Sequence, residues 1–213
     1  MMEQNRITEY INSLDSGHGQ LCDRIAREAR EAFVPIIRKE TAAFLKTMVA
    51  SARPMRILEV GTAVGYSALL MAQVMPDGAH ITTIEKYEPR IPLARAHFRE
   101  AGMEGRITLI EGDAGKVLDG LADPFDFIFM DAAKGQYIHW LPRILELLEP
   151  GGVLFSDNVL QDGNIVESRF AVERRDRTIH SRMREYLYTL KHMEELETSI
   201  IPIGDGVALS VRR

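Results

Sequence analysis

The chain has 213 residues, of which 46% are hydrophobic and 27% are charged, an ordinary composition for one globular domain. Its single cysteine, Cys22, excludes an internal disulfide and a cysteine-rich zinc site, and no apolar run reaches the ~18 residues of a membrane span. The net charge of −5 argues against a chain coated with positive charge for nucleic acids. We therefore expect residues 1–213 to form one cytoplasmic domain without a membrane partner.

Residues 1–52 predict a helical extension that precedes a core at residues 53–213. Apolar residues recur there at the spacing of a helix face, in three sets: Ile7, Tyr10, Ile11 and Leu14, then Leu21, Ile25 and Ala29, then Phe44, Leu45, Met48 and Val49. Pro35 lies between the second and third sets and separates two of the predicted helices.

Beyond residue 53, predicted strands alternate with predicted helices. The strands lie at 55–60, 79–84, 107–110 and 125–130, with a fifth from 152, and the helices at 67–75, 89–101 and 137–148. This alternation indicates an α/β fold with a parallel sheet that is covered on both faces.

The C-terminal part follows a different pattern. Residues 199–203 and 207–211 flank the turn Gly204-Asp205-Gly206, which predicts a β-hairpin. The sheet should therefore end with an antiparallel strand. A helix is predicted before this hairpin, with its inward face formed by Ile179, Met183, Tyr186, Leu187 and Leu190.

The residues after the first three predicted strands are typical of an adenosine site, because ligands of an open α/β sheet bind beyond the carboxyl ends of its strands. Gly61 and Gly65 allow a tight backbone turn and the close approach of a ligand. Glu85, 24 residues beyond Gly61, can accept hydrogen bonds from both ribose hydroxyls. Asp113 and Ala114 follow the third strand and are placed to meet an adenine edge.

The sequence lacks the phosphate-binding signals of other adenosine cofactors. Dinucleotide folds use Gly-x-Gly-x-x-Gly, but Ala63 occupies the position of the second glycine. The Gly-Lys-Ser/Thr of a phosphate-binding loop is also absent from the sequence. The pattern therefore favours an adenosine without phosphates, and S-adenosylmethionine is the predicted cofactor.

Oxygen-bearing side chains follow the fourth and fifth predicted strands. Asp131 comes directly after one strand, and Asp157 with Asn158 follows the other. If these strands are neighbours, the three side chains converge as hard oxygen ligands, which suit Mg²⁺ and leave positions for water and substrate. The alternative is that they only close turns. Lys134, three residues past Asp131, favours a metal site, with Mn²⁺ as the other candidate cation.

The sequence resembles the class I S-adenosylmethionine-dependent, cation-dependent O-methyltransferases, which include catechol and caffeoyl-CoA O-methyltransferases. The likeness spans about residues 30 to 213 and rests on residues 59–67, 131–134 and 157–160. It is closest to the bacterial tRNA 5-hydroxyuridine methyltransferases, through residues 34–36, 131–137 and 201–210. The resemblance implies a Rossmann-like seven-stranded methyltransferase sheet with a C-terminal antiparallel hairpin strand.

The resemblance also implies roles for particular residues. Glu85 would hold the cofactor ribose, Glu59 would lie under the methionine end, and Ile37 would close the pocket from the N-terminal side. The rest of the cofactor pocket would be lined by Gly61, Ser67, Asp113, Ala114 and Asp131. The metal would be held by Asp131, Asp157 and Asn158. A homodimer is implied too, with the N-terminal helices as its contact.

The implied reaction is an in-line displacement in which an acceptor oxygen attacks the methyl group of the sulfonium cofactor. Mg²⁺ acts as a Lewis acid in such reactions. Lys134 and Asp131 are the candidate catalytic residues, and Lys134 would take the proton or stabilise the oxyanion. The expected acceptor is the 5-hydroxyl of 5-hydroxyuridine at the tRNA wobble position, and the product is 5-methoxyuridine.

A basic segment favours an RNA partner. Residues 169–184 hold six arginines against Glu173 and Asp176, a local balance of +4 that could grip the phosphates of a tRNA anticodon loop. The alternative is a solvated helix face. Tyr137 and Trp140 could stack on a base, although their helical spacing is also typical of core residues.

Two other functions stay open. The chain could methylate a catechol or a caffeoyl-CoA-like phenol, although Ala132 and Ala133 are small where catechol enzymes carry bulky residues. It could also be a non-catalytic nucleotide-binding or RNA-binding module. The presence of Asp131, Lys134 and Asp157 together argues against that last function.

Overall fold

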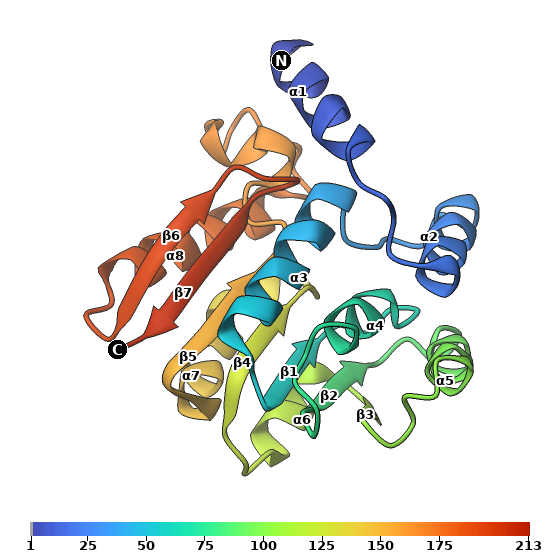
Figure 1. Cartoon of the computed structure of the whole chain (residues 1–213). Helices are drawn as coiled ribbons and strands as arrows, with labels where there is room; N and C mark the ends of the chain where they lie inside the picture. Colours follow the sequence, from blue (N-terminus) through green and yellow to red (C-terminus); the bar gives the residue numbers. More distant parts are fainter. Residues whose placement is uncertain (1) are drawn as a thin grey trace.

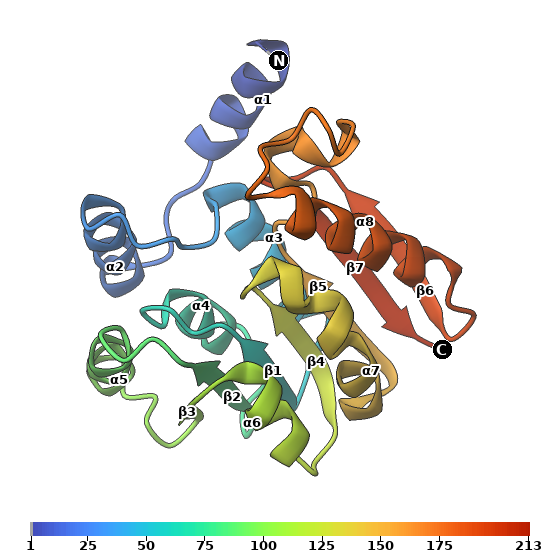
Figure 2. The ribbon, with the colours of Figure 1, turned by 180° about the vertical axis from the view of Figure 1, so that it is seen from behind.

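The computed structural model describes residues 2–213, which form a seven-stranded sheet with helices on both faces (Figures 1 and 2). The strands are β1 (Arg56–Val60), β2 (His80–Glu85), β3 (Ile107–Glu111), β4 (Phe125–Met130), β5 (Leu148–Ser156), β6 (Leu196–Ile201) and β7 (Val207–Arg212). Their order across the sheet is β3-β2-β1-β4-β5-β7-β6. The first five strands are parallel, whereas β7 runs antiparallel to both β5 and β6, so the predicted fold class is confirmed.

The helices surround this sheet. They are α1 (Met2–Ser13), α2 (Gln20–Glu31), α3 (Lys39–Ala52), α4 (Tyr66–Ala72), α5 (Ile91–Glu100), α6 (Ala114–Gly120), α7 (Tyr137–Leu147) and α8 (Arg177–His192). Two short 3₁₀ turns, η1 (Lys134–Gln136) and η2 (Gln161–Val166), follow β4 and β5. Both turns therefore lie on the side of the sheet where the parallel strands end.

Three elements differ from the sequence prediction. α6 was not predicted, because this seven-residue helix buries only Leu118 and so has no apolar period, while the Asp113 carboxylate caps it by accepting from the amide of Gly115 at 3.2 Å. The strand β5 begins at Leu148, whereas the sequence predicted a start at residue 152. Pro150 and the two glycines after it are typical of a turn, so the first half of the strand was not predicted. β6 begins at Leu196 rather than 199.

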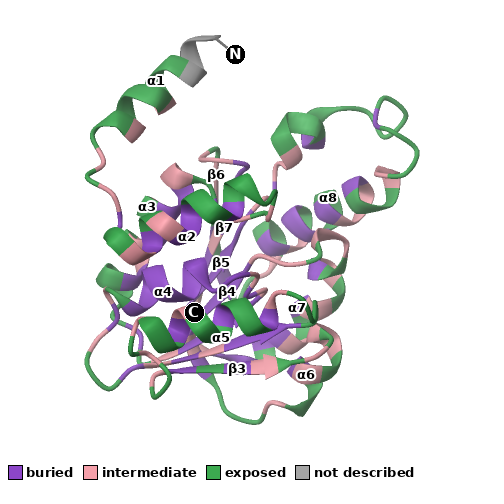
Figure 3. Cartoon of the chain, turned by 90° about the vertical axis from the view of Figure 1, so that its right-hand side faces the viewer, coloured by how far each residue is buried: buried purple, intermediate pink, exposed green. Residues whose placement is uncertain are grey.

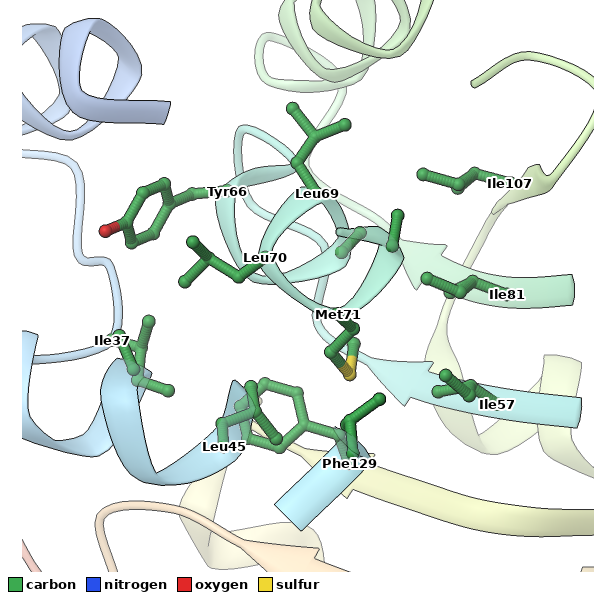
Figure 4. Close-up of a cluster of buried hydrophobic side chains, with 14 of the residues drawn as sticks. Ile37, Leu45, Ile57, Tyr66, Leu69, Leu70, Met71, Ile81, Ile107 and Phe129 are labelled. Carbon is green, nitrogen blue, oxygen red and sulfur yellow. The ribbon is translucent and has the colours of Figure 1, made fainter. Parts of the chain in front are cut away.

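The hydrophobic core has two halves, one on each face of the sheet, because successive strand residues point to opposite faces. On one face, residues of α2, α3, α4 and α5 pack against the sheet, and Figure 4 shows Leu45 of α3 near Leu70 of α4, together with Ile81 and Phe129 from the strands. Residues of α6, α7 and α8 cover the other face. Residues of α2 and α3 therefore contribute to this core.

The helix α1 stands away from this core (Figures 1 and 3). Its apolar stripe is exposed in the single chain, with exposed fractions between 53% and 67% for Ile7, Tyr10, Ile11 and Leu14. No helix within residues 2–213 has the length and apolar character needed to cross a membrane.

The turn of the β6–β7 hairpin packs closely against the segment after β5. The amide of Val159 donates to the carbonyl of Gly206 at 3.0 Å, and the amide of Leu160 donates to that of Asp205 at 2.9 Å. Gly206 has a φ of +85°, and a Cβ there would overlap the side chain of Leu160. A side chain is therefore excluded at Gly206 by both conformation and space.

The substitution Gly206→Ala should destabilise the fold strongly, whereas Gly163→Ala should cost only about 1 kcal/mol for its left-handed backbone. Both glycines have nearly the same φ, but a Cβ at Gly163 meets no atom within 4 Å. We expect Gly206→Ala to cost about 3 kcal/mol in total, since overpacking adds 1–3 kcal/mol. Urea unfolding of the two variants measures the difference, and equal losses would contradict the close packing of this turn.

Candidate active site

A cavity of about 420 Å³ lies at the carboxyl ends of the parallel strands. The predicted site residues on its wall are Ile37, Gly61, Ser67, Glu85, Asp113, Ala114, Asp131, Lys134 and Asn158. Two others, Glu59 and Asp157, are buried next to these residues and do not line the cavity. Pro35 and Ile36, from the connection between α2 and α3, complete one side. The structure thus brings the predicted cofactor, metal and catalytic residues to one place.

The loop after β1 fits tightly against the end of β4. Gly61 has a φ of +108°, and a Cβ there would overlap the carbonyl of Asp131. The amide of Ala63 then donates to Oε2 of Glu85 at 2.7 Å, while Oε1 of Glu85 accepts from the amides of Lys86 and Tyr87. Oε2 accepts only one of these bonds and so has a further lone pair, with which Glu85 can also accept from a ribose hydroxyl in the cavity.

The other end of the cavity is closed by Asp113, Ala114 and Trp140. The indole Nε1 of Trp140 would lie 3.3 Å from a Cβ at Gly115, so the indole packs closely against the start of α6. Lys86 pairs with the Asp113 carboxylate at 3.6 Å. Sequence reasoning left Trp140 as a base-stacking or core residue, and its position beside the predicted adenine edge places it on the cofactor side.

Tyr137 is a core residue and cannot stack on an acceptor base, which corrects that sequence hypothesis. Its side chain is fully buried, and its hydroxyl donates to the carbonyl of Met130 at 3.0 Å and accepts from the amide of Ala132 at 3.2 Å. These bonds fix the backbone on both sides of Asp131. Tyr137 therefore holds the backbone around Asp131 in place from within the core.

Glu59 is buried beneath the cavity and accepts hydrogen bonds from the hydroxyls of Ser67 and Thr83. Burial raises the pKa of Glu59 to about 8, and the two hydroxyls oppose that rise only in part. The side chain therefore links the start of α4 to β2 and holds Ser67 on the cavity wall.

The two acids after β4 and β5 lie beside each other. Met130 pairs with Ser156 in the parallel ladder, so Asp131 and Asp157 occupy the next positions on neighbouring strands. Burial raises the pKa of both carboxyls, and repulsion from Asp131 raises that of Asp157 further, while Lys134 opposes the rise. A divalent cation between these carboxylates would remove their repulsion.

The donor set fits a hard cation such as Mg²⁺. Asn158 lines the cavity in a left-handed conformation with φ of +59°, next in the chain to Asp157. Within residues 2–213, no three His, Cys, Asp or Glu side chains gather as a metal cluster, so a cation here would need the Asn158 amide and water as well. Mg²⁺ accepts such a set, because it usually keeps several waters beside one or two carboxylates.

Lys134 opens η1, and its Nζ lies 3.8 Å from Oδ2 of Asp205. Asp205 is buried, and its other carboxylate oxygen accepts from the amide of Asp162. Sequence reasoning missed Asp205, because it interpreted Gly204-Asp205-Gly206 only as a hairpin turn. The antiparallel pairing of β7 with β5 returns this turn to the ends of the parallel strands.

Several arginines of segment 169–184 form hydrogen bonds or ion pairs within the chain. This corrects the expectation that all six could bind phosphates. Arg177 donates to the carbonyls of Phe170 and Val172, and Arg182 donates to that of Gly135 at 3.1 Å. Arg184 lies within hydrogen-bond reach of the Ile165 carbonyl at 3.5 Å. Arg175 pairs with two adjacent acids, which are Glu173 and Asp176.

Four arginines of this segment are exposed, and two of them, Arg169 and Arg174, form neither an ion pair nor a carbonyl contact with other residues that the structure describes. Arg182 connects α8 to Gly135 directly after Lys134, so the arginine segment lies next to the cavity.

Comparison with known proteins agrees with this geometry. The family model described as O-methyltransferase matches residues 20–213. The chain belongs to the O-methyltransferase family. Caffeoyl-CoA O-methyltransferase from Populus kitakamiensis is 31% identical to it over 175 residues, which cover 79% of this chain and 74% of that protein. Tapetum-specific methyltransferase 1 from Arabidopsis thaliana is 29% identical over 186 residues, covering 85% and 78%.

Solved O-methyltransferases share the whole fold. TomG from Streptomyces achromogenes, which is involved in tomaymycin synthesis and was solved with S-adenosylmethionine, matches with a TM-score of 0.86 at 26% identity, covering 100% of this chain and 99% of that one. The Podospora anserina methyltransferase PaMTH1, solved with S-adenosylhomocysteine, matches with a TM-score of 0.88 at 25% identity, covering 100% and 96%.

The substitution Glu59→Gln should make the stability of this O-methyltransferase less dependent on pH. The Glu59 pKa is raised on folding from 4.5 to about 8, so its stabilising effect is full below about pH 4.5 and is lost as pH rises toward 8. The difference in free energy of unfolding between Glu59→Gln and wild type should therefore change in favour of the variant as pH rises, by roughly 1 kcal/mol or more between about pH 5 and pH 8.

Urea unfolding of both proteins across that pH series measures this gain. Ser67→Ala serves as the control, because it removes one hydrogen bond to Glu59 and keeps the carboxyl. A difference between wild type and Glu59→Gln that stays constant with pH would contradict the raised pKa.

Proposed function

We propose that the chain is an S-adenosylmethionine-dependent, Mg²⁺-dependent O-methyltransferase that converts 5-hydroxyuridine at the tRNA wobble position into 5-methoxyuridine. Two observations support the cofactor. The glycine loop after β1 lacks a phosphate-binding motif and lies on the cavity wall with Glu85 and Asp113, and the chain belongs to the O-methyltransferase family. The solved relative TomG contains S-adenosylmethionine. The observation that carries the reaction type is that Asp131, Lys134 and Asn158 line this same cavity, with Asp157 adjacent.

The acceptor needs two neighbouring oxygens for this site. 5-Hydroxyuridine offers its C5 hydroxyl and its C4 carbonyl, which match a cation held by Asp131, Asp157 and Asn158. When bound, Mg²⁺ supplies Lewis acidity that lowers the pKa of the acceptor hydroxyl. The oxygen loses its proton to solvent and forms a bond to the methyl carbon as the carbon–sulfur bond breaks, leaving S-adenosylhomocysteine.

Lys134 stabilises the charge on the attacking oxygen in this proposal. Its partner Asp205 is buried and fixed by the amide of Asp162, so the ammonium is held at the cavity wall rather than free in solvent. A preorganised charge of this kind acts without reorganisation during the reaction. Asp205 is thus a positioning residue that acts through Lys134.

The RNA acceptor is supported by the basic segment 169–184, which contacts the cavity's surroundings through Arg182. Arg182 holds Gly135, so the arginine segment borders Lys134, and Arg169 and Arg174 are available for phosphates. A wobble uridine lies in a single-stranded loop and can be splayed into a pocket. The small side chains of Ala132 and Ala133 on the cavity wall leave room for such a base.

A phenolic acceptor is the second candidate, because relatives of the chain are described as caffeoyl-CoA O-methyltransferases. A catechol offers the same pair of adjacent oxygens. The two candidates differ in their need for the exposed arginines, since a small catechol carries no phosphate.

Transfer of labelled methyl from S-adenosylmethionine tests the proposal. We expect label in the 5-hydroxyuridine of tRNA with Mg²⁺, and none with EDTA, when catechol and caffeoyl-CoA are assayed in parallel. Asp157→Ala should lower the rate by more than about 10²-fold, since it removes a ligand of the Lewis acid. Asp119→Ala is the control, because Asp119 is exposed and does not line the cavity.

The acceptor panel separates the candidate functions. Label only in the phenols would overturn the tRNA assignment, and cofactor binding without transfer to any acceptor would indicate a non-catalytic module. Replacing Arg169 and Arg174 by Glu should weaken RNA methylation and leave catechol turnover unchanged. Wild-type RNA affinity should fall with salt, with a log–log slope of about −0.7 for each phosphate contact.

Substitutions at Lys134 and Asp205 test the positioning role. Lys134→Met should lower kcat by about 10²-fold or more, in the range of a lost charge-stabilising group, and Lys134→Arg should retain part of the rate. Asp205→Asn should lower kcat about tenfold while the KM for S-adenosylmethionine stays unchanged. Steady-state kinetics and thermal unfolding measure this, and an effect of Asp205→Asn that persists in the Lys134→Met background would contradict action through Lys134.

A further inference from the structure

The connection between α2 and α3 presents an aromatic ring outside the mouth of the cavity. Pro35, Ile36 and Ile37 from this connection line the cavity, and Phe33 lies two residues before them. The Phe33 side chain is 93% exposed and is not part of the cavity wall. The ring therefore contributes almost nothing to the hydrophobic core.

The backbone at Phe33 favours a different residue. Phe33 has a φ of +53° and directly follows the C-terminal turn of α2, where the amide of Val34 donates to the carbonyl of Ala29 at 2.8 Å. Glycine is the usual residue at this left-handed position of a helix end, because a Cβ is disfavoured there. A bulky exposed phenylalanine at such a position is thus unfavourable for folding by both conformation and hydration.

Cationic side chains lie along the same connection as Phe33. A second cavity of about 380 Å³ lies along the same connection and shares Pro35, Ile36 and Ile37 with the first. Its wall includes the cations Arg30, Arg38 and Lys39, against the single acid Glu40. Arg30 is exposed, and Arg38 pairs with Asp162 on η2 through a solvent-exposed contact. Exposed pairs of this kind contribute little stability, so a phosphate can replace Asp162.

We propose that Phe33 is a stacking platform for the base next to the reacting uridine, and that Arg30 and Arg38 bind the phosphodiester group beside it. This inference rests on the proposed function. Proteins recognise single-stranded loops by stacking bases on aromatic rings while cations track the backbone. Because Phe33 lies outside the catalytic cavity, it contacts a neighbouring nucleotide, and the cavity itself takes the reacting base.

The charges also argue against a plain apolar partner. An exposed ring on a connection that also carries Arg30 and Arg38 suits a ligand that is flat and anionic, which describes a nucleotide. The competing occupant is a second copy of this chain, whose packing over Phe33 would cover the ring and would not require Arg30 or Arg38. The oligomeric state of Phe33 variants distinguishes the two occupants.

The test uses an anticodon stem-loop RNA that carries 5-hydroxyuridine and a 2-aminopurine as the neighbouring base, together with the free 5-hydroxyuridine nucleoside. Phe33→Ala should raise the KM for the stem-loop about tenfold or more and abolish the quenching of 2-aminopurine on binding, while kcat and nucleoside kinetics stay unchanged. Phe33→Trp should restore both readouts. Tyr188→Ala, an exposed aromatic on α8, is the matched control and should change neither.

Phe33→Gly gives a second, independent readout. It should lose stem-loop affinity as Phe33→Ala does and yet keep or raise the thermal unfolding temperature, because glycine relieves the left-handed backbone. Arg30→Gln and Arg38→Gln should each reduce the dependence of stem-loop binding on salt.

Three results would overturn the proposal. They are unchanged stem-loop KM and quenching in Phe33→Ala, an equal loss of nucleoside turnover, and a change of sedimentation with Phe33→Ala, which would assign the ring to a contact between two copies. If the wild-type protein binds the stem-loop without methylating it, the proposed function fails. The quenching measurement then still decides whether Phe33 stacks on RNA.

Discussion

The parallel alignment of β1, β4 and β5 at their carboxyl ends is the constraint on which the cavity depends. The amide of Asp131 donates to the carbonyl of Val60, and the amide of Asp157 donates to that of Met130, so the same step repeats from strand to strand. This repetition sets the two acids side by side. A register shift of one residue would turn one of them to the other face of the sheet, because strand side chains alternate.

The alignment also concentrates negative charge where solvent is scarce. Glu59, Asp131 and Asp157 all have raised pKa values, and burial is the first cause in each case. The surroundings of the three carboxyls differ. Hydroxyls from Ser67 and Thr83 satisfy Glu59, whereas Asp131 and Asp157 repel each other on the side of the cavity where Lys134 lies. Two carboxyls that repel each other suit a cation site, whereas a carboxyl whose oxygens are hydrogen-bonded, such as Glu59, suits a structural role.

Two segments from outside the parallel strands complete the cavity. The β6–β7 turn brings Asp205 against Lys134 and holds the backbone after Asn158, and the connection between α2 and α3 supplies Pro35, Ile36 and Ile37. The contact between Arg38 and Asp162 joins the α2–α3 connection to η2. Irregular segments thus build one part of the cavity wall, while the strand ends and the loops after them build the rest.

Local sequence patterns were enough to predict the strand–helix alternation and the groups that follow each strand. Hydrophobic period and turn residues are local signals, and Gly61, Glu85, Asp113, Asp131 and Asp157 each follow a strand that could be predicted. Sequence reasoning missed α6, because a seven-residue helix with one buried side chain has no apolar period, and it placed the starts of β5 and β6 too late.

Which side chains meet depends on how the whole chain folds. Asp205 reaches Lys134 because β7 returns antiparallel beside β5, and the 70 residues of chain between the two carry no signal of that contact. The contacts of Arg182 and Arg184 on α8 have no local signal either, because their carbonyl partners lie on other segments. Contacts between distant segments depend on strand order and register, and these follow from packing of the whole chain rather than from any local run of residues.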